Sequence, residues 1–256
     1  MKVILEGGLA RCRHSAITLR EYLRPGGTDL RLPNAVKISE FRRVVRGLPA
    51  ARGRVLDLGC GAGLQSALLA AAGFDVTAVD PDRENIAYAT RRGAGRHARR
   101  VVYRLGTLEE LGLPSETFDA VVSFGVLEHV DDPHSTLAAA ARLLRPGGTL
   151  HLTADAMNHV RDEAFLRTFE ISYDVRRLWD VLSVAKVVAE SGLAPYEVRY
   201  VLGGPTALGE VAHHLTTGAT RTPRENRRIL RAVTWEEQDA LSGGQFVLVR
   251  AQRRPN

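Results

Sequence analysis

The chain has 256 residues, of which 45% are hydrophobic and 25% are charged, and this fits one large α/β domain or one domain with a lid. It has no apolar run near the roughly 18 residues that a membrane span needs, and its first residues lack the pattern of a secretory signal peptide. Two cysteines are too few for a disulfide framework, so we expect a cytoplasmic protein that does not enter a membrane.

The net charge of +6 raises the question of a nucleic-acid partner. Of the 35 basic residues, however, only three are lysines, and such an arginine bias is typical of a GC-rich coding sequence. The arginine clusters in 91–100, 221–231 and 253–254 are short and are not interleaved with aromatic residues that could stack on bases. We therefore expect a solvated basic surface rather than binding to nucleic acid.

Residues 1–52 are expected to form a helical N-terminal cap. Pro25-Gly26-Gly27 interrupts this region. From Ser39 to Leu48 the apolar side chains recur at helical spacing, which predicts an amphipathic helix. Pro49 to Gly53 ends that helix just before the first strand.

The segment from Arg54 to Asp80 reads as strand, glycine turn, helix and strand, which is one βαβ unit. Glycines in the turn, Gly59 to Gly63, let the backbone lie directly against a ligand. The helix then begins at that ligand with free N–H groups. Asp80, at the tip of the second strand, is placed to accept hydrogen bonds from two ribose hydroxyls. The unit therefore predicts a site for a nucleoside.

The spacing of the glycines distinguishes between kinds of nucleoside. A dinucleotide fingerprint needs a small third residue, and this position is Leu64 or Ser66, neither of which fits well. No Lys-Ser or Lys-Thr pair follows the turn, so a phosphate-binding Walker loop is absent. The pattern D-x-G-x-G-x-G instead resembles the first motif of the class I S-adenosylmethionine-dependent methyltransferases.

This resemblance implies S-adenosyl-L-methionine as the cofactor and S-adenosyl-L-homocysteine as its product. The cofactor carries no phosphate, which agrees with the missing lysine. In this family the glycine turn lies against the methionine part, and the acid after the second strand binds the ribose. A tight turn without a ligand is the alternative. The first cofactor-binding residues that the resemblance implies are Asp57, Gly59, Cys60, Gly61, Gly63, Asp80 and Pro81.

The next elements continue the same alternation. A helix is predicted from Asp82 to Arg92 and a third strand from Val101 to Leu105. Related methyltransferases usually follow this strand with an aspartate that accepts from the adenine amino group, and Thr107 stands there, with a hydroxyl that can still accept. The fourth strand, Phe118 to Phe124, is apolar enough for a buried parallel sheet. The resemblance adds Thr107, Leu108, Ser123 and Phe124 to the cofactor-binding residues.

Two further matches support the resemblance. Phe118 to Pro133 reads F-D-x-V-x-S-x-x-V-L-E-H-V-x-D-P and resembles the methyltransferase subgroup that contains the ubiquinone-biosynthesis O-methyltransferases. A helix from Ser135 to Leu144 is followed by the turn L-R-P-G-G and a fifth strand from Thr149 to Thr153. Since the three matches together cover roughly residues 54–155, residues 53–155 are expected to be the cofactor-binding half of the core.

The remaining residues, 156–256, resemble the family in layout only. Arg176 to Ser191 is an amphipathic helix pattern, and Tyr196 to Leu202 and Gln245 to Ala251 read as the sixth and seventh strands. We expect a doubly wound, seven-stranded and mostly parallel sheet of the Rossmann-like α/β class, with the last strand antiparallel. Two additional segments are expected to form a lid over the methyl acceptor: 156–175 and 203–241.

Methylation of a hydroxyl or an amine needs a group that removes a proton from the acceptor. Histidine suits that task near neutral pH, and His129 follows the fourth strand at the sheet edge where ligands bind. In the resembling family this Leu-Glu-His segment faces the cofactor, and in some members the histidine is the base. We therefore predict His129 as the catalytic residue, with a purely loop-ordering role as the alternative. Three residues could also reach the site, although each is more typical of a surface or packing position: His14, Tyr22 and Lys37.

We predict no metal site. Asp131, Asp132 and Asp155 do not complete the acidic pattern of the Mg²⁺-dependent catechol-type methyltransferases. The adjacent His213 and His214 would point in different directions on a helix, so they would not share a metal ion.

The sequence thus predicts a methyltransferase that acts on a small-molecule hydroxyl or amine, as a monomer or homodimer. One alternative is an RNA- or protein-modifying methyltransferase, but the chain has no appended RNA-binding domain and no N-P-P-Y-type segment after the fourth strand. The other alternative is a non-catalytic S-adenosylmethionine-binding subunit. The motif acids and glycines are intact, which argues against it.

Overall fold

The computed structural model describes the chain in five stretches: residues 35–48, 53–92, 95–217, 222–236 and 243–254. His14 and Tyr22, two of the residues that could reach the site, lie outside these stretches. Of the expected N-terminal cap, the described part is the helix α2 (Ala35–Arg46) and the turn after it.

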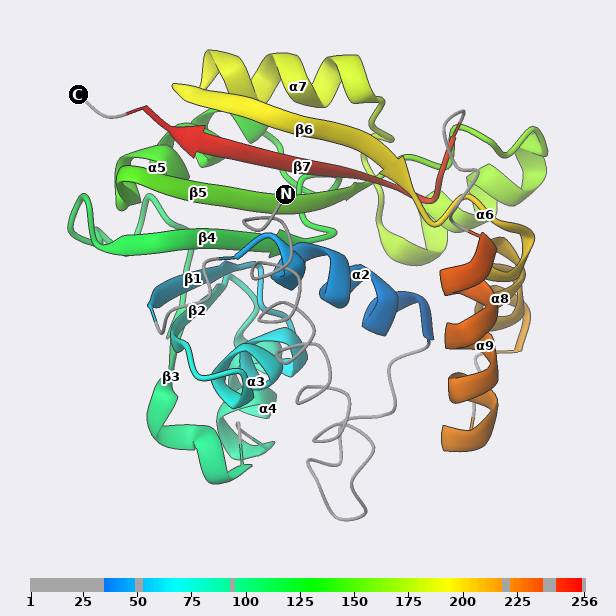
Figure 1. The fold of residues 1–256 in the computed structure, drawn as a ribbon, viewed down its shortest axis with the longest axis horizontal. Coiled ribbons are helices and arrows are strands. Elements are labelled where there is room, and N and C mark those ends of the chain that lie inside the picture. Colours follow the sequence, from blue (N-terminus) through cyan, green and yellow to red (C-terminus); the bar gives the residue numbers. More distant parts are fainter. Residues whose placement is uncertain (1–34, 49–52, 93–94, 218–221, 237–242, 255–256) are drawn as a thin grey trace, which may run out of the picture.

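A seven-stranded sheet forms the centre of the molecule, in the order β3-β2-β1-β4-β5-β7-β6 (Figure 1). Its parallel pairs run from β3 to β5, and β7 is antiparallel to both of its neighbours. The predicted doubly wound, mostly parallel sheet with an antiparallel last strand is therefore confirmed. The strands are β1 (Arg54–Leu58), β2 (Asp75–Asp80), β3 (Val101–Leu105), β4 (Phe118–Phe124), β5 (Leu144–Asp155), β6 (Leu193–Val201) and β7 (Phe246–Arg253).

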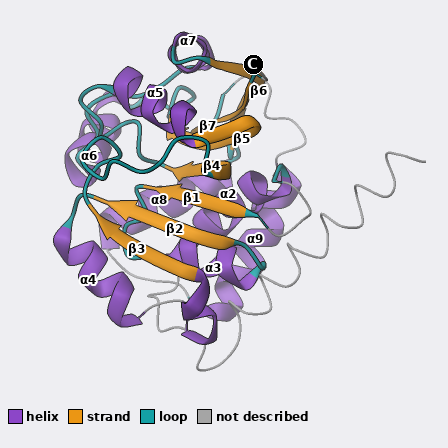
Figure 2. Cartoon of the chain, turned by 90° about the vertical axis from the view of Figure 1, so that its left-hand side faces the viewer, coloured by secondary structure: helices purple, strands orange, loops and turns teal. Residues whose placement is uncertain are grey.

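Helices cover both faces of this sheet (Figure 2). On one face Phe41 and Leu69, from α2 and α3, pack against the strands, and on the other face Leu137 and Val184, from α5 and α7, do the same. Because the central strands are covered twice, β4 is a continuous apolar run and not an alternating one. The helices after α2 are α3 (Leu64–Ala71), α4 (Arg83–Arg92), α5 (Pro133–Leu143), α6 (Glu163–Tyr173), α7 (Val181–Glu190), α8 (Pro205–Thr217) and α9 (Pro223–Glu236), with a short 3₁₀ helix at Gly95–Arg100.

Several predicted boundaries were wrong, and two of them have a clear local reason. The helix expected from Ser39 begins at Ala35, and the strand expected from Tyr196 begins at Leu193. The helix expected from Arg176 begins at Val181, because the Asp180 side chain accepts hydrogen bonds from Leu182 N and Ser183 N and so caps it there. The strand expected from Thr149 begins at Leu144 and continues through an irregularity opposite Phe118 and Ala120, so the proline-glycine turn lies inside β5.

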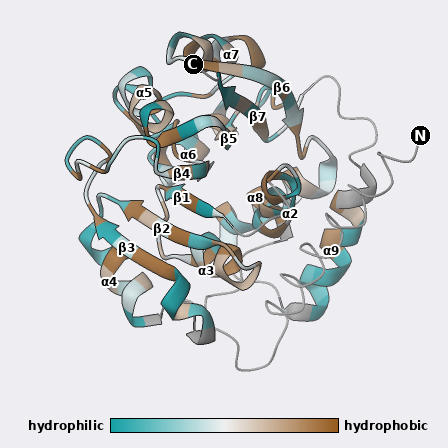
Figure 3. Cartoon of the chain, turned by 60° about the vertical axis from the view of Figure 1, so that its left-hand side comes forward, coloured by the Kyte–Doolittle hydropathy of each residue, from teal (hydrophilic) through white to brown (hydrophobic). Residues whose placement is uncertain are grey.

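The two segments predicted as a lid contain three helices at one side of the sheet. α6 contacts α8, α8 contacts α9, and α9 also contacts α2. A small separate core joins α6 and α8 around Met157, Phe169, Val175 and Val211, whereas Leu230 of α9 packs with Ile38 of α2. Figure 3 shows that α9 carries both hydrophilic and hydrophobic residues. Its exposed side is mainly basic, as expected of a solvated surface, and carries Glu225 beside Arg224, Arg227, Arg228 and Arg231.

Among the described helices, none is both long enough and apolar enough to cross a lipid bilayer.

The ionisable side chain of Asp57, on β1, is fully buried inside the sheet. Ser66 Oγ donates to one carboxyl oxygen at 2.5 Å, and the other oxygen has no hydrogen-bond partner among the described residues. Burial raises the pKa of Asp57 to about 7, although the Ser66 hydrogen bond acts in the opposite direction. The native protein therefore holds this group protonated in mildly acidic solution.

This burial predicts a pH dependence of stability. Above the unfolded-state value of 3.8 the unfolded chain loses the Asp57 proton, whereas the native chain keeps it up to about pH 7. The native state then binds more protons, so the free energy of unfolding falls as the pH rises through this range. Asp57→Asn removes the titrating group and with it this pH dependence. In urea titrations, the free energy of unfolding of wild type minus that of the variant should fall by roughly a few kcal/mol from acid to neutral pH. Parallel pH curves would contradict a buried, protonated Asp57.

Candidate functional site

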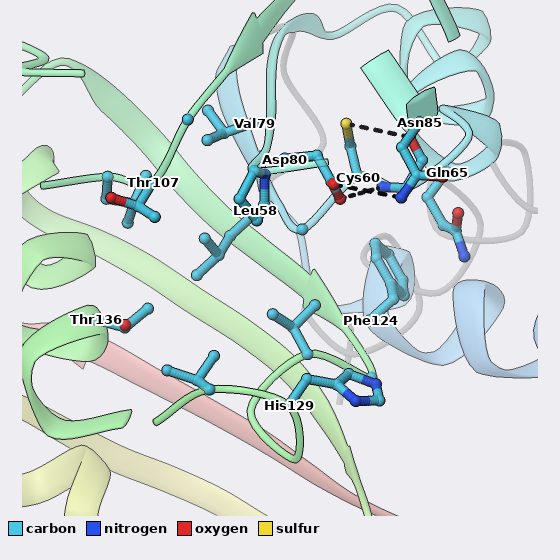
Figure 4. A pocket seen from close by; sticks show the side chains of 18 of the residues that line it. Leu58, Cys60, Gln65, Val79, Asp80, Asn85, Thr107, Phe124, His129 and Thr136 are labelled. Atoms are coloured by element: carbon cyan, nitrogen blue, oxygen red, sulfur yellow. Dashed lines mark hydrogen bonds between the residues drawn. The ribbon is translucent and has the colours of Figure 1, made fainter. Parts of the chain in front are cut away.

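A cavity of about 870 Å³ opens at the carboxyl ends of the parallel strands (Figure 4). Ligands in open α/β sheets bind at this edge, where the strand order reverses, and here β1 lies between β2 and β4. The walls come from the segments that follow four strands, together with one residue of α2 and one that precedes α7. These segments are Leu58–Gln65 after β1, Val79–Asn85 after β2, Gly106–Glu109 after β3, and Phe124–Thr136 after β4.

The glycine turn after β1 is held by backbone hydrogen bonds to the neighbouring strand. Gly59 N and Cys60 N both donate to Val79 O, at 2.8 and 3.0 Å. Gly59 has a φ of +71°, and a Cβ there would lie 2.4 Å from Val126, so only glycine fits. A Cβ on Gly61 would instead meet nothing within 4 Å. The turn thus offers bare backbone to the cavity at Gly61.

Asp80, at the end of β2, lies beside the glycine turn. Its Oδ2 accepts from Gly61 N at 2.8 Å, and its Oδ1 accepts from Asp82 N at 2.9 Å and from Asn85 Nδ2 at 3.3 Å. The side chain is largely buried but lines the cavity. Since each carboxylate oxygen has about two lone pairs, Asp80 keeps capacity to accept from a ligand.

Most of the cofactor-binding residues named from the sequence line the cavity, and three do not. Asp57 and Ser123 are buried behind the turn, where Ser123 Oγ donates to Leu58 O at 3.2 Å. A Cβ on Gly63 would lie 2.8 Å from Ala89 and from the Tyr103 hydroxyl, so this glycine lets the turn pack on α4 and β3. The lining residues from the prediction are Gly59, Cys60, Gly61, Asp80, Pro81, Thr107, Leu108 and Phe124.

Some lining residues were not predicted from the sequence. Asn85 follows Asp80 by five positions on α4 and donates to it, and a polar residue in the first turn after the acid was the available signal. Around Thr107 the chain forms a reciprocal turn, because Thr107 N donates to Glu110 Oε2 and Glu110 N donates to Thr107 Oγ1. The T-x-x-E spacing of this turn is visible in the sequence. Other polar lining residues that were not predicted include Gln65, Glu109, Thr136 and Arg176.

His129 lines the cavity beyond β4, in a turn where its N–H donates to Val126 O. Figure 4 shows it across the site from Asp80 and Asn85. Its Nδ1 lies 2.9 Å from Asp174 O. A carbonyl oxygen can only accept, so the neutral ring carries its hydrogen on Nδ1 and leaves the lone pair on Nε2. Among the described residues Nε2 makes no hydrogen bond, so this nitrogen can take a proton.

The other histidines considered from the sequence have different surroundings. His151 is fully buried in β5, and burial together with nearby Arg250 lowers its pKa to about 3. His214 on α8 stacks against Tyr173, with ring centroids 6.2 Å apart. Within the described residues, no group of three or more His, Cys, Asp or Glu side chains could hold a metal ion.

Lys37 of α2 is the lining residue that the sequence left as a surface or packing position. It forms an ion pair of 3.1 Å with Glu40 one turn along the same helix. Two further carboxyl groups lie behind it, Glu128 after β4 and Asp155 at the end of β5. Burial raises the pKa of Asp155 to about 6 and that of Glu128 well above its usual range. The β4 side of the site therefore has a buried group of charges.

Comparison with known proteins agrees with this geometry. A family described as a methyltransferase domain matches residues 56–152. The ubiquinone biosynthesis O-methyltransferase of Azorhizobium caulinodans is 35% identical over 176 residues, which are 66% of this chain and 68% of that protein. The protein of the same name from Methylocella silvestris is 45% identical over 97 residues, and this match spans only 38% of either chain.

Solved structures agree at the level of the fold. A geranyl diphosphate C-methyltransferase from Streptomyces coelicolor, crystallised with S-adenosyl-L-homocysteine, has a TM-score of 0.64 at 15% identity over 85% of this chain and 80% of its own. A possible histamine N-methyltransferase from Thermotoga maritima has a TM-score of 0.61 at 20% identity over 86% of this chain and 91% of its own. On the strength of the sequence relatives, this chain belongs to the class I S-adenosylmethionine-dependent methyltransferases.

Proposed function

We propose that this enzyme methylates a hydroxyl group of a small molecule, and that His129 is the base. The observation that carries the proposal is the hydrogen bond from His129 Nδ1 to Asp174 O, which leaves Nε2 as the proton-accepting nitrogen beside the cavity. The relatives named for O-methyl transfer support an oxygen acceptor.

The residues of the site fit the cofactor of the family. Gly61 offers an open backbone position, and the Asp80 carboxylate next to it can still accept from a ribose hydroxyl, since Oδ2 accepts only one hydrogen bond from the described residues. The strip around Thr107 and Leu108 would border the adenine, as the resemblance implied. Among the residues that the structure describes, no lysine or arginine lines this half of the cavity, in keeping with a ligand that carries no phosphate.

The chemistry then divides between the cofactor and the chain. S-adenosylmethionine, when bound, supplies a methyl group that is activated by a positive sulfur. The protein has to hold the acceptor in line with that carbon, exclude water and remove the acceptor proton. His129 Nε2 would take this proton, and the imidazolium so formed keeps its hydrogen bond to Asp174 O.

The helices α6, α8 and α9 would form the lid over the acceptor. Phe169 of α6 and Val211 of α8 share a small core of their own, and α9 connects α8 to α2. Asp174, which follows α6, belongs to the same region, so the lid would be tied directly to the proposed base.

The acceptor class can be tested with purified protein. S-adenosylmethionine and a panel of small phenols, aliphatic alcohols and amines would be incubated with the enzyme and analysed by mass spectrometry. We expect the mass of one added methyl group on hydroxyl compounds. Products formed on amines alone would contradict the proposed function.

Asp80 should dominate cofactor affinity. Asp80→Ala removes a charged acceptor, and a lost charge-assisted hydrogen bond costs about 1.5–3 kcal/mol, so S-adenosylhomocysteine should bind roughly 10- to 150-fold more weakly in calorimetry. Asp75→Ala is the matched control, because Asp75 begins the same strand at the opposite edge of the sheet and is exposed. An unchanged affinity in Asp80→Ala would mean that the ribose is held elsewhere.

His129→Ala should slow the chemical step by about 10²- to 10⁴-fold while cofactor affinity changes little, which single-turnover assays and calorimetry would show. His129→Asn separates chemistry from structure, because its amide can still donate to Asp174 O but cannot act as the base. We expect it to keep the melting temperature and lose the rate. His134→Ala is the control, since His134 also bonds a distant carbonyl, Glu190 O, without lining the cavity. A normal rate in His129→Asn would assign His129 a structural role alone.

A further inference from the structure

Four ionisable side chains from three separate parts of the chain meet beside the β4 end of the cavity. Lys37 and Glu40 come from α2, Glu128 from the turn after β4, and Asp155 from the end of β5. A Cβ placed on Gly125 would lie 3.0 Å from Glu128 Oε1 and 3.4 Å from Lys37 Nζ, so the ammonium group reaches the turn that carries His129. Asp155 interacts electrostatically with both Lys37 and His129.

Only the cation of this group faces the cavity. Lys37 lines it and its side chain is 38% exposed, whereas Glu40, Glu128 and Asp155 do not line it and are 0%, 1% and 7% exposed. The carboxyl groups thus stand behind the lysine. Within this group the charge that faces the cavity is positive. Asp131 and Asp132 also line the cavity, but Asp131 pairs with Arg176 and Asp132 accepts from Ser135 N.

The surroundings keep Lys37 charged. Burial alone would lower its pKa, but Glu40, Asp155 and Glu128 outweigh this effect and raise the pKa to about 12. Glu40 is itself fixed, because the Thr153 hydroxyl donates to its other oxygen. The ammonium also lies 5.0 Å from the centre of the Phe246 ring, on β7. The fold therefore fixes the position of the Lys37 ammonium group.

The second cation among the described lining residues is placed differently. Arg176 forms an ion pair with Asp131, and these side chains are 45% and 88% exposed. Such a pair is screened by water, so it has little influence on a buried reacting atom. Lys37 is the cation in a position to act on the acceptor.

We propose that Lys37 binds the acceptor oxygen and stabilises the negative charge that develops on it when His129 removes its proton. This assignment rests on the proposed function and makes it more specific: the acceptor is an acidic hydroxyl compound, one that gives a stable oxyanion. The proton moves to His129 Nε2, and the oxygen that loses it lies between two positive groups. Such preorganised charge is among the largest contributions to catalysis in water-poor sites.

The inference can be tested by binding, without turnover. The probe is 4-nitrophenol, whose absorption spectrum distinguishes the phenol from the phenolate, and 4-nitroaniline is the neutral probe of the same shape. With the enzyme saturated with S-adenosylhomocysteine, wild type should bind the nitrophenolate about tenfold or more tightly than the nitroaniline. It should also shift the phenol–phenolate equilibrium towards the phenolate.

Lys37→Met should abolish both effects, and Lys37→Arg should keep them. Because Lys37→Met leaves carboxylates unpaired, the double variant Lys37→Met with Glu40→Gln removes the two charges together and should give the same loss. Lys186→Met is the matched control, since Lys186 is an exposed lysine of α7 that pairs with Glu190 and does not line the cavity. It should behave as wild type.

Equal affinity of wild type for the two probes, no binding of either probe, or an unchanged preference in both variants that lack the lysine would overturn the role of Lys37. Failure of the proposed function looks different, because wild type would then transfer no methyl group to any hydroxyl compound of the panel. An enzyme that methylates hydroxyl compounds but shows no preference for the phenolate contradicts the inference alone.

Discussion

The hydrogen bond from Gly61 N to Asp80 is the interaction on which the arrangement of the site depends. It joins the turn after β1 to the end of β2, and the bonds from Gly59 N and Cys60 N to Val79 O hold the same two segments in register. A bulkier residue at Gly59 would collide with Val126 in the segment after β4. Three strand ends are therefore fixed relative to one another by backbone groups, before any ligand arrives.

Buried charge is distributed unevenly around this frame. On the β1 side Asp57 is fully buried and its pKa is raised to about 7, whereas on the β4 side Lys37 has three carboxyl groups near it. Removing water from ionised groups is costly, and proteins retain such groups chiefly where they shape a site. The two sides of the cavity therefore differ in electrostatic character, one suited to a neutral or cationic nucleoside and the other to a developing anion.

The sheet could be predicted from the sequence because its signals are local. Apolar strands and positive-φ glycines recur within a few residues of each other, and β3 and β4 lie where they were expected. The predicted start of a helix was wrong where a single capping residue decides it, as Asp180 does for α7. Asp57 was assigned to the cofactor because a motif gives order along the chain but not the direction in which a side chain points. Lys37 was undervalued because its position depends on α2 packing over the ends of β4 and β5, more than a hundred residues away in the case of Asp155.

The hydrogen bond between His129 and Asp174 O links the orientation of the imidazole to the position of the segment after α6. Asp174 has a φ of 53°, a conformation that few residues other than glycine adopt, and it ends α6. If this segment moves away, the imidazole loses the contact that selects its tautomer and can carry its hydrogen on either nitrogen. The ring is then set for proton removal only while the segment is in place. If His129 is the base and this segment moves with the lid, as proposed, the base is oriented only when the space above the acceptor is enclosed, and the Asp174 carbonyl sets that order of events.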